Sequence, residues 1–301
     1  MNIEDLQVTV GNVTFAHPIM GGAGWCKEQK HVDELVRSAS SAVIIGSITN
    51  MPLTGNEVEE YASSSDPKTS SLRMPNKGML YYLGAADRWR KEIHGAEEQK
   101  VMIANIAGSN VNEYAYLAKD LSSDFDVIEI NVGFPHVWGR HSGMKPIHFF
   151  DPKTTEQILS AIGKQFDQDG SAQMRSSFWI KLSPFLDPKL IEEVAFVISG
   201  FPFITAVCTS NTYSPFDDLT NTNYENNVIN RFTKILPESV SIIGVGGISA
   251  GEDVIRYLEA GANAVQVTTA LMRNGPQAIS TIVREYIELL EIESYAANQS
   301  A

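Results

Sequence analysis

The chain has 301 residues and a formal net charge of −13, with 23 Lys and Arg against 36 Asp and Glu. This length suits one large α/β domain, and an acidic balance without a basic block argues against nucleic acid or an anionic membrane as partner. Cys26 and Cys208 are too few for a disulfide framework or a metal site, and MNIEDLQVTV does not resemble a signal peptide. We therefore expect a single cytoplasmic domain over residues 1–301 that binds a small molecule, with no metal and no membrane association.

Apolar runs recur along the chain and predict eight buried strands. They are residues 18–21, 42–47, 101–106, 126–132, 178–182, 204–209, 241–245 and 264–268. Because these runs are apolar throughout and alternate with helical patterns, they favour a parallel sheet covered by helices. Eight such units favour a closed (β/α)8 TIM barrel, and an open doubly wound sheet is the alternative.

Several of the intervening helices have recognisable starts. Asp151 and Asp187 each precede a proline, so that each start combines an N-cap acceptor with a fixed φ angle. Later in the chain, Ser249 and Glu252 match the S-x-x-E capping box. These signals predict where three of the helices begin.

Three connections are too long for simple loops, at residues 50–81, 134–151 and 211–232. The first two follow predicted strands, so a barrel would carry them as inserted loops at its carboxyl-terminal face, where chemistry is built and lids form. The third contains the run NTNYENNVIN, and a solvated surface loop is an equally good interpretation of it.

The stretch Ile242 to Leu271 contains a complete phosphate-binding pattern. Its first strand ends at Gly246 and Gly247, where the backbone can approach a ligand closely. Thr268 and Thr269 end its second strand with amide and hydroxyl donors, and the free amides of a helix start suit a dianion. The pattern indicates a phosphorylated cofactor, although an ordinary strand, glycine and helix connection would look similar.

Strings at the strand ends resemble the dihydroorotate dehydrogenase family in order and spacing, over nearly the whole chain. They are GGAG (21–24), GSIT (46–49), MPNKGMLYYL (74–83), ANIAGS (104–109), EINVGFPH (129–136), IKLSP (180–184), TSNT (209–212) and GVGGI with VQVTTAL (244–248, 265–271). The resemblance implies an FMN-binding barrel that acts as an oxidoreductase on CH–CH groups by hydride transfer at a C–C bond.

The resemblance also implies roles for individual residues. The flavin would be bound by Gly22, Ala23, Gly24, Ser47, Asn105, Asn131, Lys181, Gly246, Gly247, Thr268 and Thr269. The substrate would be bound by Asn131, His136, Asn211 and Thr212, and the catalytic residues would be Lys181, His136 and Asn131. Reduced flavin gathers negative charge at its pyrimidine edge, and a lysine fixed there would stabilise that charge. The alternative for Lys181 is a side chain that extends from the strand end to solvent.

The family pattern breaks on the substrate side. Phe134 stands where the soluble, class 1-like branch has its catalytic cysteine, and His136 replaces a substrate-binding asparagine. Gly46 occupies a position commonly held by lysine, and Ser70 or Ser71 falls where another asparagine is expected. A phenyl ring cannot take a proton, and each lost polar partner costs on the order of 1 to 3 kcal/mol of discrimination. We therefore predict that the preferred substrate differs from dihydroorotate.

The loop after the fourth predicted strand offers replacement groups. Histidine titrates near neutrality, so His136 could serve as the base, whereas His141 and His148 are better explained as exposed loop residues. Arg140 or Lys145 could hold a carboxylate.

Cys26, just past the GGAG turn, is a further candidate base, but a small buried thiol is the better interpretation.

Two other functions stay open: genuine dihydroorotate dehydrogenase activity with a displaced base, and a noncatalytic flavin-binding protein. The resemblance also implies that the protein forms a homodimer and exchanges electrons with a soluble acceptor or donor.

Overall fold

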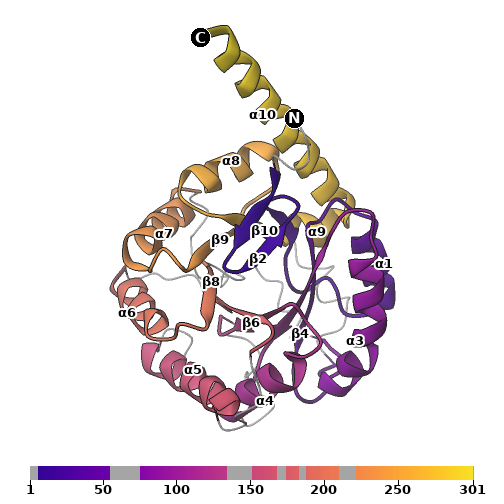
Figure 1. The fold of residues 1–301 in the computed structure, drawn as a ribbon, viewed down its shortest axis with the longest axis vertical. Coiled ribbons are helices and arrows are strands. Elements are labelled where there is room, and N and C mark those ends of the chain that lie inside the picture. The colour runs from indigo at the N-terminus through magenta and orange to yellow at the C-terminus, as the bar shows by residue number, and fades with distance from the viewer. Residues whose placement is uncertain are drawn as a thin grey trace.

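Eight parallel strands form the centre of the molecule, and helices surround them (Figure 1). This computed structural model describes residues 6–54, 75–133, 151–167, 174–182, 188–209 and 222–300. The strands of the central sheet are β3 (Ile19–Gly21), β4 (Ala42–Ile48), β5 (Val101–Ile106), β6 (Val127–Asn131), β7 (Ser177–Lys181), β8 (Ile204–Cys208), β9 (Ser241–Val245) and β10 (Ala264–Val267). Their order is β3-β10-β9-β8-β7-β6-β5-β4. All eight apolar runs predicted as strands therefore form strands.

Most of the described helices lie between successive strands in the chain and form an outer ring, and α10 extends away from that ring (Figure 1). They are α1 (Gln29–Val36), α3 (Met79–His94), α4 (Val111–Leu121), α5 (Pro152–Asp167), α6 (Pro188–Ser199), α7 (Thr222–Ile235), α8 (Gly251–Glu259), α9 (Thr269–Asn274) and α10 (Gln277–Ser300). Within the described ranges, no helix combines the length and apolar character needed to cross a membrane.

The first and last strands of the sheet, β3 and β4, meet and close it. The backbone N–H and the hydroxyl of Ser41 both donate to the Ile19 carbonyl, at 3.1 and 2.8 Å. Further along, Cys26 and Ile45 form a parallel bridge. The sheet is therefore a (β/α)8 barrel, and the open doubly wound alternative is wrong, because an open sheet would leave these strands at opposite edges.

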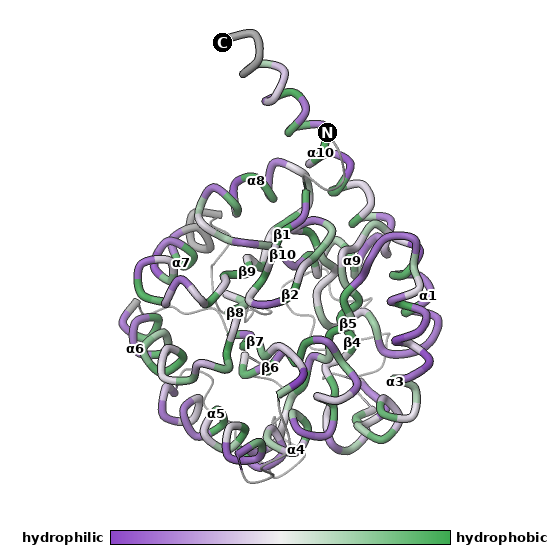
Figure 2. The backbone as a smooth tube through the Cα atoms, in the orientation of Figure 1, coloured by the Kyte–Doolittle hydropathy of each residue, from purple (hydrophilic) through white to green (hydrophobic). Residues whose placement is uncertain are grey.

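Apolar side chains cover both faces of the strands, which explains why the runs are apolar throughout. Outside the sheet, Trp89 of α3, Leu117 of α4 and Leu159 of α5 belong to one large buried cluster. Inside the barrel, a second cluster includes Ile103 and Trp179. Figure 2 shows hydrophobic segments along the central strands and mixed polar and apolar segments around the helical ring.

A hairpin that the sequence did not predict closes the amino-terminal end of the barrel. It consists of β1 (Val8–Val10) and β2 (Val13–Phe15), which pair in antiparallel orientation. Phe15 is buried in the inner cluster with the first residues of several barrel strands, and its ring lies 5.7 Å from that of Trp179. Ser241, the first residue of β9, accepts a hydrogen bond from the Gly11 N–H at 2.8 Å. The hairpin thus leaves the carboxyl-terminal end for the site.

Of the three predicted helix starts, the one at Asp151 agrees with the structure in full. The Asp151 carboxylate accepts hydrogen bonds from the Lys153 N–H at 3.1 Å and the Thr154 hydroxyl at 2.7 Å, at the start of α5. Helix α6 begins at Pro188 as predicted, while Asp187 lies outside the described residues.

The third predicted start is wrong by one residue. The N-cap of α8 is Ala250, and the carboxylate that accepts from its N–H, at 3.1 Å, is Asp253. Asp253 also accepts from the Ser249 N–H at 2.7 Å, whereas Glu252 is exposed. The reason is positional, because a capping-box carboxylate must occupy the third helical residue, which is Asp253 when the helix begins at Gly251.

The second half of the connection predicted over residues 211–232 is helical, and residues 211–221 lie outside the described residues. Helix α7 begins at Thr222, and Val228, Ile229 and Phe232 are buried. The spacing of these three side chains fits one face of a helix, and the asparagines between them obscured this pattern in the sequence.

The buried His17 predicts an acid-sensitive component of stability. Its Nδ1 accepts from the Ile19 N–H at 3.2 Å and its Nε2 lies 2.7 Å from the Ala39 carbonyl, so the neutral ring is fully bonded. Burial, aided by the charge of Lys100, lowers the pKa of His17 from 6.5 to about 4. Because the unfolded state binds the proton first, this stability is complete above about pH 6.5 and is lost as the pH falls towards 4.

We expect urea unfolding to show about 2 kcal/mol less stability from this residue at pH 5 than at pH 7.5. The His17→Gln variant should lack that component of the pH dependence. An identical loss of stability between the two pH values in both proteins would contradict the assignment.

Candidate active site

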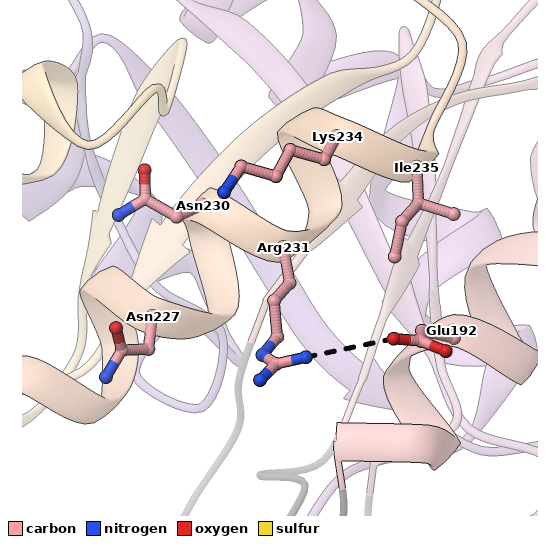
Figure 3. A pocket seen from close by; sticks show the side chains of 6 residues that line it. All are labelled: Glu192, Asn227, Asn230, Arg231, Lys234 and Ile235. Carbon is pink, nitrogen blue, oxygen red and sulfur yellow. Dashed lines mark ion pairs between the residues drawn. The ribbon is translucent and has the colours of Figure 1, made fainter.

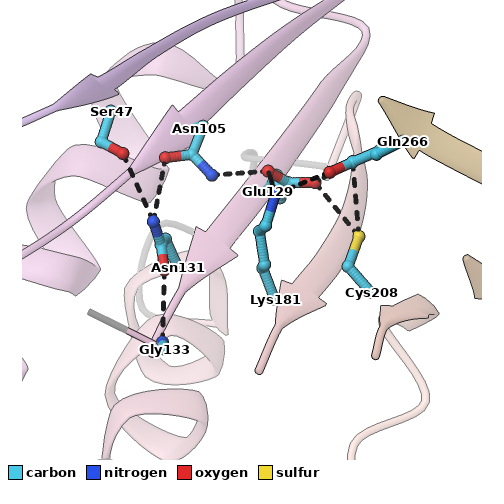
Figure 4. Close-up of polar contacts among 8 residues, drawn as sticks. All are labelled: Ser47, Asn105, Glu129, Asn131, Gly133, Lys181, Cys208 and Gln266. Carbon is cyan, nitrogen blue, oxygen red and sulfur yellow. Dashed lines mark hydrogen bonds and ion pairs between the residues drawn. The ribbon is translucent and has the colours of Figure 1, made fainter. Parts of the chain in front are cut away.

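Five strands each place one buried polar side chain inside the barrel near its carboxyl-terminal end (Figure 4). We call these residues the polar layer: Asn105 (β5), Glu129 (β6), Lys181 (β7), Cys208 (β8) and Gln266 (β10). In the strand register Asn105 pairs with Glu129 and Lys181 pairs with Cys208, and side-chain contacts join the two pairs. Side chains from several parallel strands form such layers in (β/α)8 barrels.

The Glu129 carboxylate lies at the centre of the polar layer and is fully buried. Its Oε1 accepts from Asn105 Nδ2 at 2.5 Å, and its Oε2 accepts from Gln266 Nε2 at 2.5 Å and from the Cys208 thiol at 3.1 Å. The Lys181 ammonium lies 3.9 Å from Oε1. Since every partner offers hydrogens, the carboxylate is bound in its acceptor-only, ionised form.

Lys181 is buried and does not extend to solvent, so the solvent-exposed alternative for this residue is wrong. Its Nζ donates to Gln266 Oε1 at 2.6 Å. Burial raises the pKa of the neighbouring Cys208 thiol, and the charge of Glu129 raises it further. Cys208 therefore stays a protonated donor, and Lys181 is a fixed positive charge at the carboxyl-terminal end of β7.

Asn131, at the end of β6, joins the polar layer to its neighbours. Its Nδ2 lies 3.3 Å from both Ser47 Oγ and Asn105 Oδ1, and its Oδ1 accepts from the Gly133 N–H at 3.2 Å. The Tyr114 hydroxyl of α4 donates to its backbone carbonyl at 2.7 Å. Ser47, Asn105 and Asn131, which were all predicted to contact the flavin, thus lie together although they come from three different strands.

The GGAG turn after β3 approaches the end of β10. The Gly22 N–H donates to the carbonyl of the last β10 residue at 2.8 Å, and a Cβ at Gly22 would overlap the hydroxyl of Thr268. Thr268 is the N-cap of α9, and Thr269 is its first residue. Ala23 is partly buried and packs against the inner cluster, whereas a Cβ at Gly24 would have no neighbour within 4 Å in the part of the chain that the structure describes.

The glycines after β9 adopt conformations that favour glycine. Gly246 has a φ angle of 120° and Gly247 one of 64°. The Tyr257 hydroxyl donates to the Gly246 carbonyl at 2.6 Å and holds the turn. A Cβ at Gly247, like one at Gly24, would meet no atom of the described residues within 4 Å. The described residues therefore leave the backbone uncovered at both turns, as a bound cofactor requires.

Gly46 also has a structural reason to be glycine. Its φ angle is 122°, and a Cβ would overlap the Asn105 carbonyl oxygen. The lysine commonly found at this family position would be strained on this backbone.

Apart from Asn131 and Gly46, the predicted substrate side lies outside the described residues. This applies to Phe134, His136, Asn211 and Thr212, and also to Ser70, Ser71, Arg140, His141, Lys145 and His148. Their predicted roles stay predictions.

Cys26 forms part of the barrel wall. It is fully buried at the bridge to Ile45, and burial raises the pKa of its thiol well above the ordinary value. A thiol in this environment is a poor base, so the core interpretation holds.

The residues missed from the sequence are Glu129 and Gln266. Glu129 interrupts an apolar strand two positions before Asn131, so period-two alternation was the available signal there, and Gln266 is the one polar residue of β10. The two side chains are 137 residues apart in sequence, and only the closed barrel pairs them.

A separate hollow of about 380 Å³ lies between α6 and α7, on the outer ring (Figure 3). Its Arg231 and Glu192 side chains are largely exposed and form an ion pair of 3.8 Å. Exposed pairs of this kind contribute little energy, and the hollow contains none of the polar layer. The strand ends are therefore the better candidate site.

The fold and the polar layer define the class of protein. It is a (β/α)8 barrel enzyme with a buried lysine ammonium group, Lys181, at the end of the barrel where such enzymes carry out chemistry. A family model described as dihydroorotate dehydrogenase matches residues 5–227 and 223–290. The chain belongs to the dihydroorotate dehydrogenase family, whose members are oxidoreductases.

Two curated relatives illustrate the similarity. Dihydroorotate dehydrogenase A (fumarate) of Lactococcus lactis subsp. lactis (strain IL1403) is 28% identical over 313 residues, which cover 96% of each chain. Dihydroorotate dehydrogenase (fumarate) of Saccharomyces bayanus is 27% identical over 308 residues, covering 94% of this chain and 93% of the relative. Among solved structures, the dihydroorotate dehydrogenase of Eimeria tenella in complex with ferulenol has a TM-score of 0.81 at 18% identity, covering 97% of this chain and 86% of that one. This last similarity supports the fold alone.

Proposed function

We propose that this protein is an FMN-dependent oxidoreductase that transfers hydride between the flavin and a C–C bond of a small cyclic or carboxylated substrate. The observation that carries the proposal is the buried Lys181 ammonium in the polar layer, at the end of the barrel that the hairpin leaves free. Bound FMN would supply the hydride-accepting ring, which no amino-acid side chain provides.

The described residues fit such a cofactor in chemistry and in space. Within the described ranges, no side chain or backbone atom covers the turns at Gly24 and Gly247, as a close-lying ring or phosphate needs. Thr268 and Thr269 offer hydroxyl and amide donors to the phosphate. Lys181 would stabilise negative charge that develops beside it, and the polar layer keeps that ammonium from moving into solvent.

We further propose that dihydroorotate is not the preferred substrate. Phe134 and His136 replace two functional family residues, and the backbone at Gly46 disfavours a third. Genuine dihydroorotate dehydrogenase activity is the second candidate, favoured by relatives whose names specify that reaction with fumarate. A noncatalytic flavin-binding protein is the third, consistent with the phenyl ring in place of a base.

Anaerobic mixing separates these functions. Purified protein loaded with FMN would be mixed with dihydroorotate, NADH or NADPH, and then with fumarate or oxygen, while flavin absorbance is followed. We expect reduction and reoxidation by one donor and one acceptor, with little orotate formed. Rapid orotate formation would establish the second candidate, and no bleaching with any donor would favour the third. Failure to bind FMN at all would overturn the proposal.

His136→Ala should slow reduction of the flavin by substrate about 100-fold or more if this histidine is the base, since general base catalysis contributes that much. Stopped-flow absorbance measures the step directly. His141→Ala is the matched control from the same loop and should reduce at the parental rate. An unchanged rate in His136→Ala would remove the residue from catalysis.

We also propose a homodimer in the cytoplasm that uses a soluble electron acceptor or donor. Light scattering after gel filtration tests the oligomeric state, and a single mass near 33.1 kDa would contradict the dimer.

A further inference from the structure

We propose that Glu129 is a positioning residue that fixes the Lys181 ammonium and partly neutralises it, so that this pair sets the positive charge at the barrel mouth. The redox consequence rests on the proposed function. The coupling between the two side chains does not.

Because Glu129 is buried, its charge interacts strongly with that of Lys181. Its side chain is fully buried, that of Lys181 is 3% exposed, and their charged atoms lie 3.9 Å apart. In an interior of low dielectric, such charges interact far more strongly than on the surface. Losing one partner leaves the other as an uncompensated buried charge.

The surrounding amides hold the pair in a defined geometry. Gln266 contacts both members, since its Nε2 donates to Glu129 and its Oε1 accepts from Lys181. Asn105 fixes the second carboxylate oxygen and is itself linked to Asn131. These contacts prevent the carboxylate from rotating away, and the ammonium therefore cannot shift without breaking a hydrogen bond.

The sign of the redox effect follows from the charges. A carboxylate beside Lys181 offsets part of the positive field that would favour reduced, anionic flavin. Removing that negative charge should therefore make flavin reduction easier and shift its potential in the positive direction.

The redox experiment compares Glu129→Gln with the parent, both loaded with FMN. Sulfite, which adds to electron-poor flavin, should bind at least about tenfold more tightly to the variant, and the two-electron potential should rise by about 30 mV, the equivalent of tenfold. Glu129→Asp keeps the charge and should change the sulfite affinity less. Trp179→Phe is the matched control, because it alters the interior beside Glu129 without changing charge. An unchanged or more negative potential in Glu129→Gln would overturn the redox role.

A second experiment needs no flavin and separates failure of this inference from failure of the proposed function. The unfolding equilibrium is measured for the parent, Glu129→Gln, Lys181→Met and the double variant. We expect a coupling of at least tenfold in the unfolding constant, with the double variant more stable than the sum of the single effects implies. Should Glu129→Gln alone not fold, recovery of folding in the double variant would support the pairing. Additive effects, or no such recovery, would overturn it.

Discussion

Lys181→Met should lose about 3 to 5 kcal/mol of unfolding free energy and most of its affinity for FMN. The stability loss follows because methionine leaves the buried Glu129 carboxylate without its cation. The loss of affinity follows from the role proposed for the ammonium beside the flavin. Guanidinium unfolding measures the first effect, and fluorescence titration of flavin-free protein with FMN measures the second.

Lys100→Met is the matched control for this variant. Lys100 is also buried, but it lies at the amino-terminal end of β5, where its Nζ donates to the carbonyls of Ser38 and Ser40 at 2.8 Å each. Its replacement should reduce stability while leaving FMN affinity within about threefold, or about 0.7 kcal/mol, of the parent. Equal loss of FMN affinity in both variants would mean that destabilisation alone explains the Lys181 result.

Gly247→Ala should weaken FMN binding at least about tenfold, equivalent to about 1.4 kcal/mol. Gly247 has a φ angle of 64°, and its added Cβ would occupy the space beside the turn that we assign to the phosphate. The backbone strain itself costs roughly 1 kcal/mol. Fluorescence titration with FMN and thermal unfolding without FMN measure the two effects separately.

The chain supplies a close control for that strain. Gly275, at the end of α9, has a φ angle of 69° and equally open surroundings. Because its ψ angle of −173° lies in a region essentially restricted to glycine, Gly275→Ala should lose at least as much stability and keep its FMN affinity. If Gly247→Ala also keeps its affinity, the phosphate does not lie at this turn.

The barrel could be predicted from the sequence because each of its strands leaves the same local pattern, and that pattern recurs along the chain. Each strand is buried on both faces and so appears as an unbroken apolar run, and β4 (Ala42–Ile48) is a clear example. Closure could not be read from any single run, since it depends on Ser41 meeting the strand that contains Ile19. The β1–β2 hairpin was missed because two strands of three residues carry too little pattern.

Site residues could be predicted only where the sequence contains a string that resembles the family. Those strings brought out Asn105, Asn131 and Lys181, which the structure places in one network through Glu129. The role of Glu129 could not be predicted, because the sequence around it does not show which groups donate hydrogen bonds to its buried carboxylate. Those partners come from other strands, and local sequence contains no record of them.

The division of the charge pair between β6 and β7 has a consequence for folding. Along the chain, Glu129 belongs to the fourth strand of the barrel and Lys181 to the fifth, so a half-formed barrel containing one without the other would hold a solitary charge in a partly dry interior. Such an intermediate is disfavoured relative to both the unfolded chain, where water solvates each ion, and the complete barrel, where the ions meet. The pair thus opposes accumulation of half-barrels and favours folding of the two halves as one cooperative unit.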